Sequence, residues 1–210
     1  MPDLIAPHGG QLNERLVTGD AAEALAERAR SLKTVTLDAR QVTDLELLAV
    51  GALSPLDGFM GKADYDRVID EMHLASGAVW SVPVTLGVSG EEARSLVGTE
   101  VTLVTPEGTP LAVMQVAEAF DADRHREARK VYRTDDMAHP GVEAIFAQGN
   151  ALIGGSVQGV ALPPNPEFPE YRLTPAQTRV SGPISRAICR TFSAMASRST
   201  SSQLGRSWPC

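Results

Sequence analysis

The chain has 210 residues, of which 43% are hydrophobic and 21% charged, enough apolar sequence for one domain with a buried core. Four arginines and no acidic residue follow residue 179, so residues 1–179 hold 15 basic and 26 acidic residues, a net charge of −11. This acidity argues against nucleic-acid binding, which needs clustered Lys and Arg. No apolar run reaches the roughly 20 residues of a membrane helix, and no signal peptide is recognised, so a cytoplasmic protein without a membrane partner is expected.

Helices are predicted where apolar residues recur at helical spacing or strong helix formers accumulate. These segments are residues 21–31, 41–50, 63–72, 91–97, 121–131 and 142–148. Asp20 is available as the N-cap of the first helix, and Gly51 follows the end of the second. Pro140 opens the last helix and Gly149 ends it.

Strands are predicted where β-branched or alternating runs occur, at residues 34–37, 79–88, 100–105, 110–119 and 151–162. The third and fourth are joined by Pro-Glu-Gly-Thr and form the clearest hairpin. Pro83 removes one backbone donor from the strand over 79–88, which favours an edge strand or a bulge. Strands scattered among short helices favour an α+β domain with a small barrel-like sheet over a doubly wound one.

The segment 53–61, LSPLDGFMG, joins two predicted helices and is the most informative connector. Pro55 favours an extended Ser54, and Asp57-Gly58 supplies a turn. Its apolar residues are too numerous for a solvated loop. We therefore expect this segment to pack its own side chains onto the core.

Two possible sites are rejected on their residues. Gly149-x-x-x-x-Gly154-Gly155-Ser156 is close to a phosphate-binding loop, but Gly155 replaces the required Lys and a strand stands where a helix N-terminus is needed. The four histidines show neither i, i+3 nor i, i+4 spacing, and no cysteine lies near them, so no metal site is predicted. The two cysteines do not form a disulfide framework.

The segment 131–141 is the most specific in its polar residues, because four of them stand just before a helix that begins with proline. These candidates are Arg133, Asp135, Asp136 and His139. The favoured interpretation is structural: their side chains cap backbone N–H groups, and the arginine pairs with an aspartate. The alternative is that they contact a ligand at the helix N-terminus.

Several short segments, in family order, resemble the N-terminal domain of sulfate adenylyltransferases (ATP sulfurylases). They are Pro7-His8-Gly9-Gly10, the segment 53–61, the Trp80-to-Leu86 strand, Pro106-Glu107-Gly108 with Pro110-Leu111-Ala112, Arg133 to Val142, Gln148-Gly149 with Gly154-Gly155, and Arg172-Leu173-Thr174-Pro175. Each segment is short, but together they cover about residues 1–179, so the set is specific.

The resemblance implies a PUA-like β pseudo-barrel of α+β type with short surrounding helices. It implies that this domain spans residues 1–170 and that residues 171–179 begin the junction to a catalytic domain. The family's enzyme transfers the adenylyl group of ATP to sulfate, giving adenosine 5′-phosphosulfate and pyrophosphate, with ATP and Mg²⁺ as substrate.

The family's catalytic motif, Gln-Thr-Arg-Asn-Pro-x-His-Arg-Ala-His, belongs to the following domain. Gln177-Thr178-Arg179 spells its first three letters, but Val180-Ser181-Gly182 follows, and no histidine occurs after His139. The triplet also comes too early, directly after Leu173-Thr174-Pro175. We therefore expect no catalytic, cofactor-binding or metal-binding residue in this chain.

Residues 180–210 differ in composition from the rest, since they lack Asp, Glu and Lys and are rich in Ser and Arg. No helical or alternating period persists through them. Because the break falls where the next domain should begin, we hypothesise an out-of-frame or truncated tail. A natural basic, Ser-rich tail is the alternative.

The leading hypothesis is the N-terminal domain of a sulfate adenylyltransferase that is inactive alone. One alternative is a PUA-like RNA-binding module, which the net charge of residues 1–179 opposes. Another is an interaction domain that self-associates or docks onto an intact homologue or a catalytic domain of the same family.

Overall fold

A computed structural model of the chain describes residues 5–163 and 172–180. One compact unit comprises residues 5–167, and a second comprises residues 1–4 and 168–210. The described part of the second unit contains helix α7 (Pro175–Val180), whose start is capped by the side chain of Thr174, which accepts a hydrogen bond from the Gln177 backbone at 3.2 Å. The predicted tail lies outside the described residues from position 181 onward.

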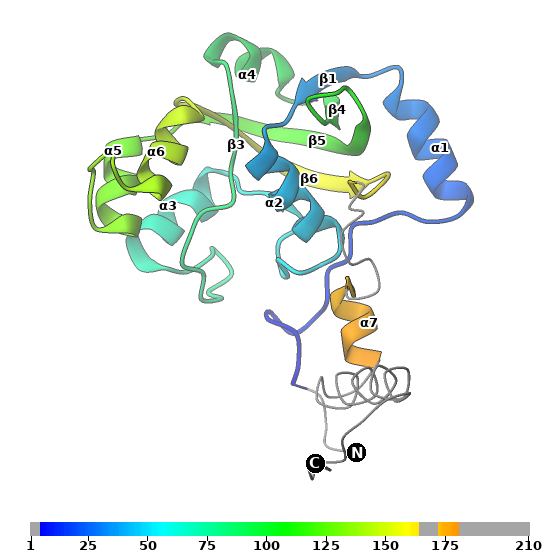
Figure 1. The fold of residues 1–210 in the computed structure, drawn as a ribbon, viewed down its shortest axis with the longest axis horizontal. Coiled ribbons are helices and arrows are strands. Elements are labelled where there is room, and N and C mark those ends of the chain that lie inside the picture. Colours follow the sequence, from blue (N-terminus) through cyan, green and yellow to red (C-terminus); the bar gives the residue numbers. More distant parts are fainter. Residues whose placement is uncertain (1–4, 164–171, 181–210) are drawn as a thin grey trace, which may run out of the picture. The chain divides into compact units, whose positions relative to one another are not determined.

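The described strands of the first unit form one mixed sheet (Figure 1). Along the sheet they follow in the order β1 (Lys33–Thr36), β4 (Glu100–Val104), β5 (Pro110–Asp121), β6 (Ala151–Gly159) and β2 (Gly58–Phe59), and β3 (Leu86–Val88) also pairs with β6. The pair β1–β4 is parallel, and every other pairing is antiparallel. The predicted hairpin is confirmed as β4 and β5.

The α+β class is confirmed, but these strands do not close into a barrel. The path ends at β1, which pairs only with β4 among the described strands, and at the short strand β2. A two-residue strand offers too few backbone groups to continue the ladder around to β1. The sheet therefore stays open, and helices cover its apolar side chains.

The helices of this unit match the predicted segments to within a few residues. They are α1 (Asp20–Ala29), α2 (Ala39–Ala49), α3 (Lys62–Glu71), α4 (Gly90–Leu96), α5 (Arg124–Glu127) and α6 (Pro140–Ala147). Asp38 and Gln41 form a capping box at the start of α2. Asp20 is the first helical residue of α1 and not its N-cap, which is Gly19. The predicted helix over 121–131 begins later, because β5 extends to Asp121, and α5 continues as a π-helix, η1 (Ala128–Tyr132).

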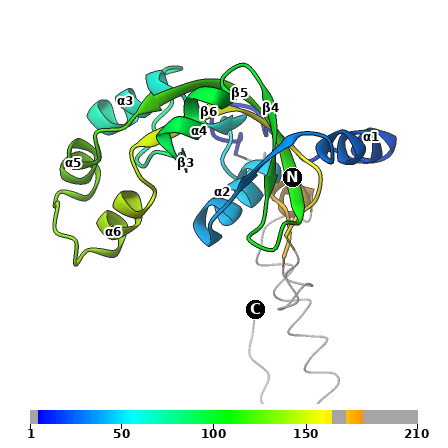
Figure 2. The same cartoon turned by 90° about the horizontal axis from the view of Figure 1, so that it is seen from above.

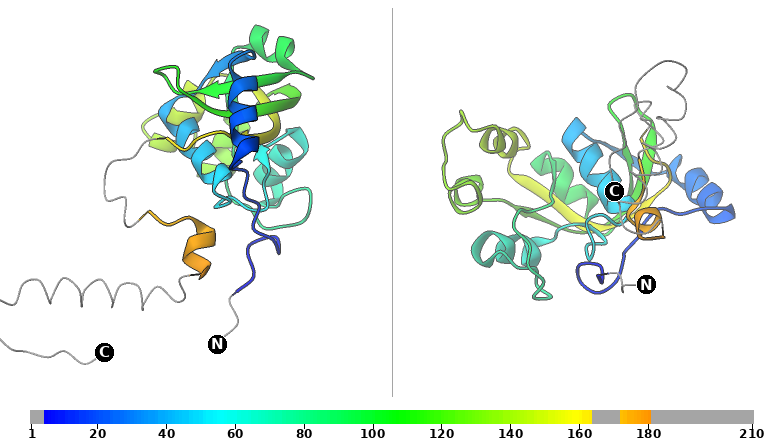
Figure 3. Two further views of the ribbon diagram at one scale, coloured as in Figure 1. Left: turned by 90° about the vertical axis from the view of Figure 1, so that its right-hand side faces the viewer. Right: turned by 60° about the horizontal axis from the view of Figure 1, so that its bottom comes forward.

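The two faces of β5 carry different helices because successive strand residues point to opposite sides. Val113 packs with Leu25 of α1, whereas its neighbour Met114 packs with Leu48 of α2. Figure 2 shows α1 and α2 on opposite sides of β5. In the left view of Figure 3, α1 lies in front of the strands. Helices α3, α5 and α6 gather near one end of β5 and β6 (Figure 1).

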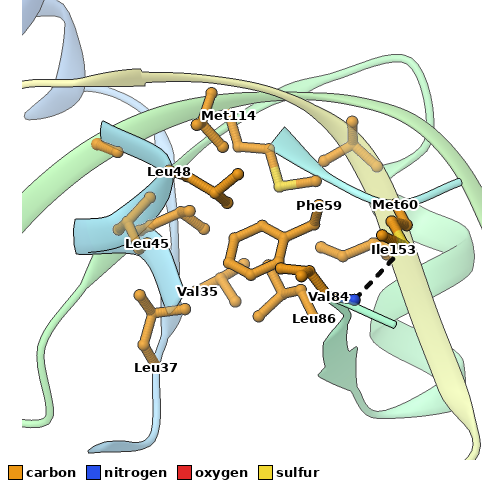
Figure 4. Close-up of a cluster of buried hydrophobic side chains, with 14 of the residues drawn as sticks. Val35, Leu37, Leu45, Leu48, Phe59, Met60, Val84, Leu86, Met114 and Ile153 are labelled. Atoms are coloured by element: carbon orange, nitrogen blue, oxygen red, sulfur yellow. Dashed lines mark hydrogen bonds between the residues drawn. The ribbon is translucent and has the colours of Figure 1, made fainter. Parts of the chain in front are cut away.

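The segment 53–61 packs onto the main core, as expected. Leu56, Phe59 and Met60 are buried, and the ring of Phe59 lies among side chains of the sheet and α2 (Figure 4). The Met60 sulfur accepts a hydrogen bond of 3.4 Å from the Val84 backbone, the dashed line in Figure 4. The segment 53–61 therefore contacts both α2 and the residues that lead into β3.

The predicted strand over 79–88 is wrong in its first part, since only Leu86–Val88 forms β3. Pro83 has no N–H to donate to a ladder. The indole N–H of Trp80 instead donates to the Val82 carbonyl at 2.8 Å, and the Met60 backbone donates to the Val84 carbonyl at 2.9 Å. Residues 79–84 are thus an irregular segment, held by the Trp80 side chain and by contacts with the segment 53–61.

Candidate functional site

An open groove of about 590 Å³ lies on the first unit. Its lining comes from six separate parts of the chain. The lining residues are His8, Arg40, Asp44, Leu53, the segment 79–84, Tyr132, Gly141 and Ala144.

The groove gathers segments that the sequence resemblance identified independently of any structure. His8 comes from the Pro-His-Gly-Gly segment, Leu53 from the segment 53–61, and Gly141 from the segment 133–142. The imidazole of His8 lies 2.8 Å from the carbonyl oxygen of Val79, and its ring centroid is 6.1 Å from that of Trp80. Residues more than 100 positions apart in sequence therefore meet at one surface.

Two charged side chains of α2 line the groove one helical turn apart. Arg40 Nε lies 3.4 Å from Asp44 Oδ2, a long contact for an i, i+4 pair. Gln148, with Oε1 turned toward the guanidinium, accepts from Arg40 Nη1 at 2.8 Å and from Nη2 at 3.1 Å. Burial raises the pKa of Asp44 above its usual 3.8, and the Arg40 charge only partly opposes this shift.

Tyr132 stands at the end of the π-helix and is held in place from two sides. A Cβ added to Gly141 would overlap the Tyr132 ring, so only glycine allows this close approach. The His139 ring lies with its centroid 5.3 Å from that of Tyr132. Desolvation raises the pKa of Tyr132, so its phenol is neutral at pH 7. π-Helical turns often occur at functional positions.

A buried polar network supports the helical turn before Tyr132. Arg124 and Glu127 are each 2% exposed, and Arg124 Nη1 donates to Glu127 Oε2 at 2.8 Å. The same carboxylate oxygen accepts from the Tyr65 hydroxyl at 2.8 Å, and Arg124 Nε donates to the Gly149 carbonyl at 2.8 Å. The network ties α5 to α3 and to the turn before β6, which fixes where η1 begins.

None of the four sequence candidates lines the groove, although their neighbours Tyr132 and Gly141 do. Arg133, Asp135, Asp136 and His139 are all exposed. The His139 imidazole accepts from the Gly141 backbone at 3.1 Å, and Asp136 Oδ1 accepts from the Ala138 backbone at 2.9 Å.

The ion partner of Asp135 is Arg129, at 3.4 Å. The sequence had suggested Arg133, which instead ends η1 in the left-handed conformation with φ 61°.

Sequence reasoning missed Arg40 and Asp44, although a signal for them existed. They stand four residues apart in a helix whose other face is apolar, which is the spacing of an ion pair on one helical face. Their proximity to Trp80 and Tyr132 could not be inferred, because it depends on packing between distant segments.

The described ranges, 5–163 and 172–180, contain no cluster of three or more metal-ligating side chains. In the same ranges no helix is long and apolar enough to cross a membrane. What the groove offers chemically is apolar surface beside one guanidinium, one carboxylate, one phenol, the His8 imidazole and the Ser81 hydroxyl. His8 Nε2 contacts the Val79 carbonyl oxygen at 2.8 Å, a contact that positions the ring on the backbone and pairs it with no nucleophile.

Comparison with known proteins gives consistent results at the level of sequence. A sulfate adenylyltransferase from Symbiobacterium thermophilum is 54% identical over 180 residues, 85% of this chain and 46% of that protein. A sulfate adenylyltransferase from Nostoc punctiforme is 45% identical over 179 residues, with the same coverage of both chains. The chain thus spans about half the length of these curated relatives.

A solved structure is also similar to this chain. The solved structure described as a hexameric APS kinase from Thiobacillus denitrificans is similar, with a TM-score of 0.66 and 31% identity over 85% of this chain and 31% of that chain. The family model described as a PUA-like domain matches residues 5–162, which is nearly all of the first unit. The chain therefore belongs to the PUA-like domain family.

Proposed function

We propose that this chain acts as the N-terminal, non-catalytic domain of a sulfate adenylyltransferase, the enzyme that joins the adenylyl group of ATP to sulfate. The observation that carries the proposal is the identity of 54% with one such protein over 85% of this chain, within only 46% of that protein's length. A domain so similar to part of an enzyme is expected to share its place in that enzyme.

The chemistry of the groove supports a role other than catalysis. Adenylyl transfer requires several cationic or metal groups around the triphosphate to stabilise charge that develops on the transferred phosphoryl group. Among the described lining residues Arg40 is the one Lys or Arg side chain, and it already contacts Asp44 and Gln148. We therefore assign the reaction to a part of the enzyme that follows this domain.

The test is sulfate-dependent release of pyrophosphate from ATP by the purified chain, with the Symbiobacterium thermophilum enzyme as the positive control. We expect no release above the rate without sulfate. Release at a rate comparable to the control would contradict the assignment of a non-catalytic role.

We further propose that the partner of this domain is a polypeptide and not a nucleic acid. The net charge of −11 over residues 1–179 repels phosphate backbones. The solved relative is described as hexameric, which supports assembly among related proteins. Salt-sensitive, micromolar binding of RNA by the chain would contradict this part of the proposal.

A further inference from the structure

Two exposed apolar side chains, Val79 and Val82, belong to the lining of the groove. Val79 is 60% exposed and Val82 is 44% exposed. Met72, 48% exposed, is linked to the same segment, because its carbonyl oxygen accepts from the Trp80 backbone at 2.8 Å. Exposed apolar side chains that gather on one segment can mark a binding surface.

The residue types in the groove are those that contribute most to protein–protein binding. Trp, Tyr and Arg dominate the energetic centres of interfaces, and the groove presents Trp80, Tyr132 and Arg40 together. Each of the three is held before binding: Trp80 through its indole N–H, Tyr132 against Gly141, and Arg40 by Gln148. Side chains that are ordered in advance lose little conformational entropy on binding.

The shape and charge of the groove also indicate the kind of occupant. An open groove beside exposed valines would leave a small molecule largely in water, whereas known small-molecule sites bury most of the ligand. Asp44 is a half-buried carboxylate whose ion-pair partner, Arg40, is 3.4 Å away, so it can still accept from a donor. An apolar side chain beside a basic or N–H-bearing group would complement this surface and the acidic domain around it.

We infer that the groove formed by Arg40, Asp44, Trp80, Val82 and Tyr132 is the surface on which the catalytic half of a sulfate adenylyltransferase packs. This inference rests on the proposed function. The relatives' matched part is only 46% of their length, so more than half of each relative lies outside this domain and is long enough to cover such a groove. The groove combines exposed apolar area, preorganised anchors and an incompletely paired carboxylate, which fits that partner.

The test compares the accessibility of two valines in two proteins. Val82→Cys places a thiol in the groove. Val97→Cys is the control, because Val97 lies at the end of α4 and outside the lining. The two valines are equally accessible, with exposed fractions of 44% for Val82 and 45% for Val97. Each variant is made in the full chain and in a chimera in which residues 1–179 replace the matching segment of the Symbiobacterium thermophilum enzyme. Maleimide labelling of each position is followed by mass spectrometry of its peptide.

We expect both positions to label at similar rates in the full chain, and position 82 to label at least about ten-fold more slowly in the chimera while position 97 is unchanged. Equal labelling of position 82 in both proteins would overturn the inference. The pyrophosphate release of the unmutated chimera is measured separately and tests the proposed function. An active chimera with an accessible position 82 would therefore contradict the inference alone.

A second variant gives an independent readout. Val82→Asp should leave the melting temperature of the full chain unchanged, because the side chain is exposed there. In the chimera it should lower the melting temperature, because the aspartate would be buried without a partner. Val97→Asp should leave the melting temperature of both proteins unchanged. An unchanged melting temperature of the chimera with Val82→Asp would also overturn the inference.

Discussion

Gly141 packs directly against the ring of Tyr132 at the wall of the groove. The position of the Tyr132 ring therefore depends on the absence of a side chain at residue 141. Gly141 belongs to the first turn of α6, and Tyr132 is the last residue of η1. The contact therefore fixes the distance between two helical segments as well as the position of the phenol.

Replacing Gly141 by alanine should destabilise the domain although alanine is the better helix former. The Cβ would overlap the Tyr132 ring, and such overpacking costs about 1–3 kcal/mol, against at most about 1 kcal/mol gained from helix propensity. Urea unfolding measures the difference. Gly90→Ala is the matched control, because its Cβ would meet Ala151 at an ordinary 3.9 Å at the start of α4. A Gly141→Ala variant as stable as Gly90→Ala would refute this account of the contact.

Glu127→Gln should be far more destabilising than Tyr65→Phe, although both change the same buried network. Glu127→Gln leaves the Arg124 guanidinium buried without its counter-ion, which typically costs about 3–5 kcal/mol. Tyr65→Phe removes one hydrogen bond to Glu127, worth about 1 kcal/mol. Both are compared by denaturant unfolding at pH 7. Similar small losses for the two variants would show that Glu127 is not the counter-ion that the domain needs.

The same network predicts a loss of stability in alkali. Burial, followed by the nearby Glu127 charge, raises the pKa of the Tyr65 phenol above its ordinary value of 10.0. The folded state then keeps the proton that the unfolded chain loses, so this contribution is intact below pH 10 and is lost as the pH rises further. The loss approaches about 1.4 kcal/mol per pH unit, and Tyr65→Phe should abolish it. Parallel pH profiles of the two proteins would contradict the assignment.

Asp44→Asn should stabilise the isolated chain at pH 7. Burial raises the pKa of Asp44 above 3.8, so the folded state favours the protonated carboxyl, and ionisation at neutral pH costs stability. The advantage of asparagine should shrink as the pH falls through the raised pKa of Asp44 toward 3.8, and it should be absent below that pH, where the carboxyl is protonated in both the folded and the unfolded chain. Thermal unfolding of both proteins between pH 3 and pH 7 measures the effect. A loss of stability at pH 7 would instead mean that the Arg40 pair outweighs desolvation.

Local signals in the sequence were sufficient for most of the helices and for the hairpin. Asp38 and Gln41 satisfy each other's backbone groups within one turn, and β4 and β5 are joined by four residues, so neither depends on distant contacts. The segment 53–61 was also predictable as a core element, because its apolar residues are too numerous for a solvated loop.

The rest required information that no local pattern contains. Residues 79–84 have the composition of a strand, but Pro83 and the contacts of Met60 and Trp80 keep them out of the sheet. Arg40, which lines the groove, is held by hydrogen bonds to Gln148, more than 100 positions away. The sequence pointed to the polar residues at 133–139, whereas the groove is lined by Tyr132 and Gly141 on either side of them.

The most direct test of the central claim is the activity of the unmutated chimera, in which residues 1–179 stand in place of the matching segment of the Symbiobacterium thermophilum enzyme. If this chain is the N-terminal domain of such an enzyme, the chimera should release pyrophosphate from ATP in a sulfate-dependent reaction at a rate within about ten-fold of the parent, a difference of about 1.4 kcal/mol in activation free energy. A chimera that is folded, soluble and inactive would contradict the claim.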